Sequence, residues 1–260
     1  MEIPLFPLHT VLCPGIVLPL HIFEERYQAL VRHCLDTGLP FGVVLIRNGR
    51  EVGPGAASTL AGVGAFAEIR RAGRYPDGRF DLLAAATGRF AIESVDAMKA
   101  PYLVADVTPL DEEVGDESRA ERLSAAAIRR FVRYLELMRA RDGETAQVLD
   151  IQVELDAPDD AEDAEDAERE AATLDDDGDD DDDDSANELT IPDDPTVLSY
   201  LLAGIVQIEL PRRQRLLEAE TTEDRLGELV ALLDREILLL GDRLRYYAPD
   251  PQLMGGAVRS

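Results

Sequence analysis

The dominant spacing of hydrophobic residues changes close to Leu110. Before that point, short apolar runs alternate with glycine and proline, and in residues 80–86 apolar side chains recur at every second position. After Leu110 they recur every three or four residues. A repeat of two is typical of β-strands and a repeat near 3.6 is typical of helices. The sequence therefore predicts an α+β chain in which a β-rich lobe precedes a helical lobe.

The first lobe holds several short candidate strands and one candidate helix. The helix is predicted over residues 23–35, with Gly38 and Pro40 ending it. Asn48-Gly49 and Pro76-Asp77-Gly78 predict tight turns. Strands of this length and spacing favour a compact antiparallel β-barrel or sandwich. The predicted strands are residues 16–18, which we expect to be buried, and 41–46, 62–74, 80–86, 90–95 and 102–110.

The second lobe carries start signals for four helices. Ser118-x-x-Glu121 resembles a capping box, and the helix after it is predicted to end near Gly143. Asp194 before Pro195 predicts an N-cap followed by proline at the first helical position. Pro211 begins a short helix, and Thr221 or Thr222 is expected to cap the last one.

Acidic charge is concentrated in one segment. Residues 156–188 contain 19 Asp or Glu and one arginine, a charge of −18, which leaves −9 of the total −27 for the rest. Such a segment repels itself and buries little apolar area, so it is predicted to be a disordered insertion. Neither part of the chain offers the basic field that phosphate backbones require, which disfavours nucleic-acid binding.

The cysteines and the N-terminus suggest a reduced, cytoplasmic protein. Cys13 and Cys34 are far apart, and with three scattered histidines they do not make a zinc site. Prolines interrupt the apolar first 20 residues, which lack the basic start of a signal peptide. No run of about 18 apolar residues predicts a membrane span. We expect no metal and no cofactor.

These patterns divide the chain into predicted regions. A β lobe with one helix is expected over residues 1–113 and a helical lobe over 114–248. The acidic insertion, 156–188, lies within the helical lobe, and residues 249–260 are expected to form a flexible tail.

Several strings resemble the N-terminal substrate-binding domain of Lon proteases. Near the start they are Pro4-Leu5-Phe6-Pro7-Leu8 and Leu18-Pro19-Leu20-His21-Ile22-Phe23-Glu24, the latter especially similar to stand-alone versions of the domain. Near the end they are Gln214-x-x-Leu217-Glu218 and Glu223-x-Arg225-Leu226. The likeness runs through residues 1–248 apart from the acidic insertion. The sequence departs from the family at two places. The family often has Gly-Thr where this chain has Gly64-Ala65, and often has Arg-Arg-Phe after the hairpin where this chain has Gly88-Arg89-Phe90.

The resemblance implies a PUA-like β-barrel followed by a helical bundle, and a role in recognising polypeptides. In complete Lon proteases an ATP-driven unfoldase and a Ser–Lys protease follow this domain. No phosphate-binding GxxxxGK[ST] loop and no GxSxG motif occurs in this sequence, and Lys99 is its only lysine. We therefore expect no catalytic residues.

The predicted peptide-binding surface is an apolar groove between the two lobes. The partners implied are polypeptide substrates or a protein such as a full-length Lon protease, bound by a monomer or weak homo-oligomer. The candidate residues are Leu18, Leu20, His21, Phe23, Tyr27 and Phe66.

Three functions remain open at this point. The first is a non-catalytic adaptor or holder in protein quality control. The second is a peptidase-associated enzyme, which the family association alone suggests. The third is an RNA-binding module, because some PUA-like domains bind RNA, although the charge balance argues against it.

Overall fold

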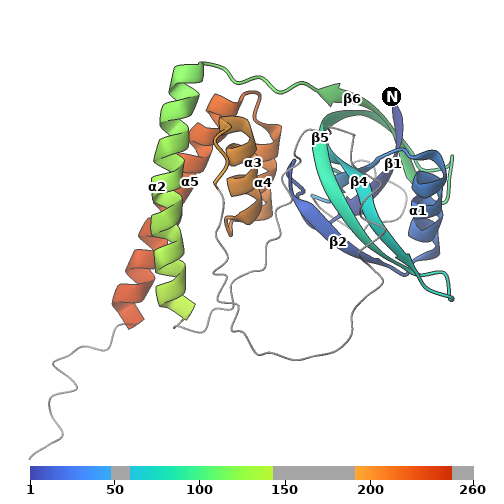
Figure 1. The fold of residues 1–260 in the computed structure, drawn as a ribbon, viewed down its shortest axis with the longest axis horizontal. Coiled ribbons are helices and arrows are strands. Elements are labelled where there is room, and N and C mark those ends of the chain that lie inside the picture. Colours follow the sequence, from blue (N-terminus) through green and yellow to red (C-terminus); the bar gives the residue numbers. More distant parts are fainter. Residues whose placement is uncertain (48–58, 143–190, 248–260) are drawn as a thin grey trace, which may run out of the picture. The chain divides into compact units, whose positions relative to one another are not determined.

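The structure is a computed structural model, and it describes residues 1–47, 59–142 and 191–247 (Figure 1). Six strands and one helix come first, and four helices follow. The first group is β1 (Glu2–Leu8), β2 (Val17–Ile22), α1 (Glu25–Thr37), β3 (Phe41–Leu45), β4 (Val63–Arg74), β5 (Phe80–Asp96) and β6 (Leu103–Leu110). The second is α2 (Glu117–Asp142), α3 (Pro195–Ile205), α4 (Leu210–Glu218) and α5 (Thr222–Tyr247). The predicted α+β order is confirmed.

The strands form a closed barrel with one extra edge strand. Their order is β2-β5-β4-β3-β1-β6, and β5 also pairs with β6, so β5, β4, β3, β1 and β6 make a ring (Figure 1). The pairings are antiparallel except for β1 with β3, which is parallel. Closure leaves β2 beside β5 at the end where β5 meets the β4–β5 hairpin.

Strand β5 corrects one sequence prediction. Residues 80–86 and 90–95 were predicted as separate strands, but Phe80–Asp96 is a single strand of 17 residues. Gly88 does not end it, because the ladder continues to β4 on one side and β6 on the other. Register shifts between Phe66 and Ala67 and between Ile92 and Ser94 mark irregularities of the ladder at which the long strand can bend.

Strand β2 is less buried than predicted. The sequence suggested a buried strand over residues 16–18, whereas β2 begins at Val17 and most of its side chains are partly exposed. The reason is its edge position, since β5 is its one strand partner in the described chain. Ile22 at its end is buried.

Two apolar cores hold the described part of the chain together. One fills the barrel beneath α1 and includes Phe6, Tyr27 and Phe41. The other joins the barrel to the four later helices. Packing around Gly64 is close, because a Cβ there would lie 2.5 Å from the carbonyl oxygen of Val43. Any larger residue would push neighbouring strands apart.

Helices α2 and α5 lie side by side and run in the same direction. Arg119 near the start of α2 pairs with Glu223 near the start of α5. Eleven residues further along each helix, Arg130 pairs with Asp234. Because both partners advance by the same number of residues, the two helices are parallel. The shorter α3 and α4 lie between them in the sequence and return the chain to the start of α5.

The helix caps agree with the sequence in two of three cases. Asp194 accepts hydrogen bonds from the backbone N–H groups of Thr196 and Val197, as predicted. Thr221 accepts from the N–H of Asp224 and caps α5. The capping box at Ser118 is wrong: α2 begins at Glu117, and Asp116 accepts the hydrogen bond from Arg119 N–H. Asp116, two residues before Ser118, is therefore the residue that caps the helix.

Several sequence predictions lie outside the described residues. They are the turn at Asn48-Gly49, the helix end at Gly143, the acidic insertion at 156–188 and the tail at 249–260. Within the described ranges, no helix combines the length and the apolar character needed to cross a membrane.

Candidate functional site

Three aromatic side chains meet on the surface where β2 ends beside the β4–β5 hairpin. We call His21, Phe23 and Tyr75 the aromatic cluster. The His21 ring stacks 6.3 Å from Phe23 and meets Tyr75 edge-on at 6.3 Å. Phe23 is 65% exposed and Tyr75 40% exposed. Exposed rings of this size that touch one another are typical of protein-binding surfaces.

One carboxylate holds two of these rings. Asp81 Oδ1 accepts a hydrogen bond from His21 Nδ1 at 2.6 Å, and Oδ2 accepts from the Tyr75 hydroxyl at 2.5 Å. The pairing of β2 with β5 places His21 directly across from Asp81. These hydrogen bonds, first from Tyr75 and then from His21, lower the pKa of Asp81, and the same carboxylate raises the pKa of Tyr75.

The hairpin after β4 completes the arrangement. Gly78 adopts a positive φ of 92°, and its N–H donates to the carbonyl of Tyr75, which closes the turn predicted at Pro76-Asp77-Gly78. The guanidinium of Arg79 lies 5.3 Å above the Tyr75 ring, and its Nε donates to Asp77. The turn thus brings a cation against the outer side of the cluster.

The structure places the six predicted site residues in different environments. His21 and Phe23 come together at the surface. Leu18 and Leu20 are partly buried against the core beneath α1. Tyr27 is buried and stacks on Phe6 at 4.1 Å between ring centroids. Phe66 is partly buried and packs on Phe90.

The described residues offer this surface little covalent chemistry. Cys13 and Cys34 are both buried, and burial raises their pKa values to about 11 and about 12. A thiol with so high a pKa is a poor nucleophile at neutral pH. No group of three or more His, Cys, Asp or Glu side chains in the described ranges is arranged to hold a metal ion. The aromatic cluster offers ring faces and an imidazole, and the neighbouring Arg79 adds a guanidinium.

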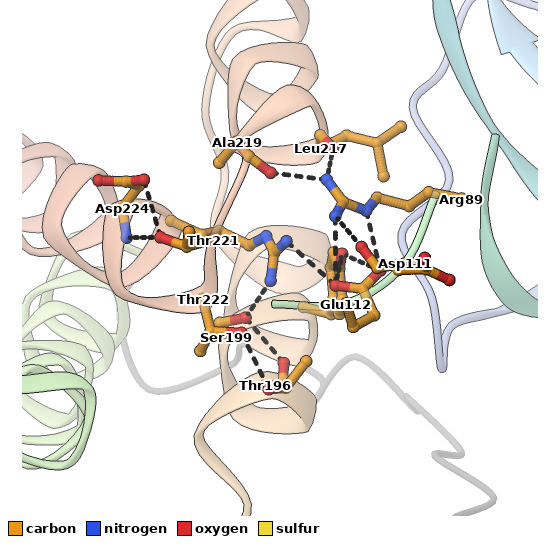
Figure 2. A network of polar contacts seen from close by, with 12 residues as sticks. Arg89, Asp111, Glu112, Thr196, Ser199, Leu217, Ala219, Thr221, Thr222 and Asp224 are labelled. Atoms are coloured by element: carbon orange, nitrogen blue, oxygen red, sulfur yellow. Dashed lines mark hydrogen bonds and ion pairs between the residues drawn. The ribbon is translucent and has the colours of Figure 1, made fainter. Parts of the chain in front are cut away.

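A second polar network is buried between the barrel and the helices (Figure 2). Arg89 on β5 is 3% exposed and donates to the carbonyl oxygens of Leu217 and Ala219. Its Nε donates to Glu112, just beyond β6, at 2.9 Å. Both carboxylate oxygens of Glu112 accept from the hydroxyl of Tyr200 at 2.7 Å.

Arg225 on α5 enters the same network from the other side. It is completely buried, donates to Ser199 Oγ and the Leu216 carbonyl, and lies 3.4 Å from Glu112. Its guanidinium covers the Tyr200 ring at 3.7 Å. Burial lowers the pKa of Arg225 and raises that of Tyr200. Two guanidiniums sharing one carboxylate tie β5, the segment after β6, α3 and α5 together.

Sequence reasoning missed Arg89, Glu112 and Tyr200 as a set, although it had noted Arg89 within Gly88-Arg89-Phe90. The string around Arg225 was recognised by its family likeness, and in the structure Arg225 is a buried member of this network. Gln214, from the other helical string, is 3% exposed and donates to the Val63 carbonyl on β4. Both strings therefore supply buried side chains that join the helices to each other or to the barrel.

Comparison with known proteins gives one consistent result. The family model of the ATP-dependent protease La (LON) substrate-binding domain matches residues 2–235. The Lon protease 2 of Herpetosiphon aurantiacus is 25% identical over 92% of this chain and 24% of its own length. The Lon protease of Flavobacterium johnsoniae is 30% identical over 46% of this chain and 15% of its own length. The chain thus corresponds to about a quarter or less of these relatives.

Two solved structures share the fold. The crystal structure of a Lon N-terminal domain protein from Xanthomonas campestris superposes with a TM-score of 0.52 at 22% identity, covering 89% of this chain and 98% of that one. The N-terminal domain of a Mycobacterium avium complex Lon protease gives a TM-score of 0.53 at 15% identity, covering 90% and 98%. These two likenesses concern the fold, and the family model, which matches most of the chain's length, shows that the chain belongs to the Lon substrate-binding domain family.

Proposed function

We propose that this chain binds non-native polypeptide segments through the aromatic cluster and serves as an adaptor or holder in protein quality control. The observation that carries the proposal is the exposure of Phe23 and Tyr75 against His21 at one edge of the barrel. Unfolded chains expose apolar side chains, and rings that are already clustered and partly ordered bind them at low entropic cost. Membership of a substrate-binding domain family supports the same role.

Side chains, rather than an added strand, are the proposed means of recognition. Strand β2 has a free edge among the described strands, and such an edge can accept an extended peptide. Pro19 stands in the middle of β2 and has no N–H to donate. It interrupts the row of donors that a bound strand would need. The ring faces beside the edge remain available.

The proposed surface is narrower than the residue set expected from sequence. Tyr27 has its ring stacked within the core, and Phe66 packs on Phe90. Leu18 and Leu20 are in part occupied by core contacts. We therefore centre the proposal on His21 and Phe23 and add Tyr75, which belongs to the hairpin.

Binding of a permanently unfolded protein tests this function. With fluorescently labelled, reduced and carboxymethylated lactalbumin, we expect the full chain to raise the anisotropy and Phe23→Ala to weaken binding about tenfold. Met98→Ala is the matched control, because Met98 is 93% exposed on the loop before β6, away from the cluster. Equal affinity of Phe23→Ala and the unaltered chain would exclude the cluster, and absence of any binding would exclude the function.

A further inference from the structure

The β4–β5 hairpin carries positive charge in a chain that is otherwise strongly acidic. Residues 70–81 contain four arginines and two aspartates, a local charge of +2 within a total of −27. Both aspartates are engaged within the hairpin region: Asp77 pairs with Arg79, and Asp81 accepts from His21 and Tyr75. The Asp77–Arg79 ion pair is exposed on both sides, so it is weak and leaves the Arg79 guanidinium accessible to a further carboxylate, whereas Asp81 keeps its charge and is held by hydrogen bonds.

Arg71 presents its charge on the side of the sheet that carries the aromatic cluster. It pairs across the ladder with Leu83, two residues from Asp81 along β5, and alternate residues of a strand face the same side. Its side chain is exposed, and it forms no ion pair with any residue that the structure describes. Arg79, stacked on Tyr75, adds a second guanidinium beside the rings.

The exposed rings and the cations thus occupy one surface, formed by the end of β2 and the hairpin. At physiological ionic strength the Debye length is about 8 Å, so an approaching segment responds mainly to charges near the contact. The remote acidic residues are largely screened. At the contact itself, carboxylates are attracted to Arg71 and Arg79, and lysine side chains are repelled.

We infer that the aromatic cluster selects polypeptide segments in which aspartate or glutamate stands next to aromatic or aliphatic residues. This inference rests on the proposed function and narrows it to one class of segment. The rings bind the apolar side chains, while the guanidiniums of Arg71 and Arg79 receive the carboxylates. Segments of equal apolar content that carry lysine instead bind least well.

Three labelled peptides of equal length test the selection. They share the same phenylalanine and leucine positions and carry glutamate, glutamine or lysine at the positions between. Anisotropy titrations with the full chain are expected to rank the affinities glutamate, then glutamine, then lysine, with about tenfold between the extremes. Equal affinities would overturn the inference and leave the proposed function standing, whereas no binding of any peptide would count against both.

Variants assign the preference to its residues. Arg71→Glu is expected to reduce the glutamate-over-lysine preference to about twofold or less and to leave the glutamine peptide unchanged. Arg122→Glu changes the same charge at an exposed position on α2 and is expected to keep the preference. If Arg122→Glu removes it equally, net charge rather than the hairpin is responsible, and the inference is wrong.

A fourth peptide separates charge from the apolar requirement. Residues 156–188 of this chain carry a charge of −18 and contain no aromatic residue. A synthetic peptide of this segment is expected to bind at least tenfold more weakly than the glutamate peptide. Equal or tighter binding would show that charge alone is recognised, with the chain's own acidic segment as occupant, and would overturn the inference.

Discussion

The aromatic cluster and the buried arginine network are built from the same chemical parts. In each, one carboxylate accepts hydrogen bonds from groups on different elements: Asp81 from His21 and Tyr75, Glu112 from Arg89 and Tyr200. The two sites differ in how far their side chains are exposed to solvent. Arg89 and Arg225 are almost completely buried, whereas the rings of the cluster are 40% exposed or more.

The difference decides what each arrangement does. Inside the protein, a guanidinium without a partner is costly, so the network specifies how the helices meet the barrel. At the surface, water replaces any lost partner, and the same bonds contribute little to folding. They orient rings that stay accessible. We therefore expect substitutions in the buried arginine network to have large effects on stability, and substitutions in the aromatic cluster to affect binding.

Removing the carboxylate of the buried network should give the largest effect. Glu112→Ala leaves Arg89 and Arg225 sharing no anion, which we expect to lower the free energy of unfolding by about 3 kcal/mol. The figure is at the low end of the range for buried pairs, because Glu112 is itself 34% exposed. Urea denaturation followed by circular dichroism measures it.

Glu93→Ala is the matched control, since this exposed carboxylate of β5 accepts one hydrogen bond from Thr108. Its loss is expected to change the free energy of unfolding by less than about 0.5 kcal/mol. Similar values for the two variants would show that the network is no more than a set of surface contacts.

The sequence predicted most elements because their signals are local. Hydrophobic spacing marked β4, β6 and α5, and Asp194-Pro195 marked the start of α3. Errors arose where distant pairing overrode a local signal. Residues 80–86 and 90–95 were predicted as two strands, yet pairing with β4 and then with β6 keeps β5 continuous between them.

The candidate site was predicted in part for the same reason. His21 and Phe23 were found because they are close together in a recognisable string. Asp81 and Tyr75 were missed, because the register of β2 against β5 brings Asp81 to His21, and the β4–β5 hairpin brings Tyr75 to Asp81. Arg89 and Glu112 are 23 residues apart and meet through the β5–β6 pairing, which no short motif announces.

Asp81 tests whether ring orientation matters for binding. Asp81→Asn keeps the size of the side chain, but its amide NH₂ cannot accept a hydrogen bond as the second carboxylate oxygen does. We expect the affinity for the unfolded protein to fall about threefold, with a native circular dichroism spectrum. Asp106→Asn, at an exposed carboxylate bonded to Ser94, should leave the affinity unchanged. Unchanged binding by Asp81→Asn would mean that the rings need no carboxylate to hold them.

The pH dependence of Asp81 should give the smallest effect. Hydrogen bonds from Tyr75 and His21 lower the pKa of Asp81 in the folded chain, so its contribution to stability is complete above the ordinary aspartate value of about 3.9. The contribution is lost as the pH falls through the lowered pKa. Side-chain carbon NMR should show a midpoint for Asp81 below about 3.9, and combining His21→Ala with Tyr75→Phe should raise it. A midpoint that does not move in the double variant would mean that the two donors do not stabilise the carboxylate in solution, and the cluster would then be three neighbouring rings without a common anchor.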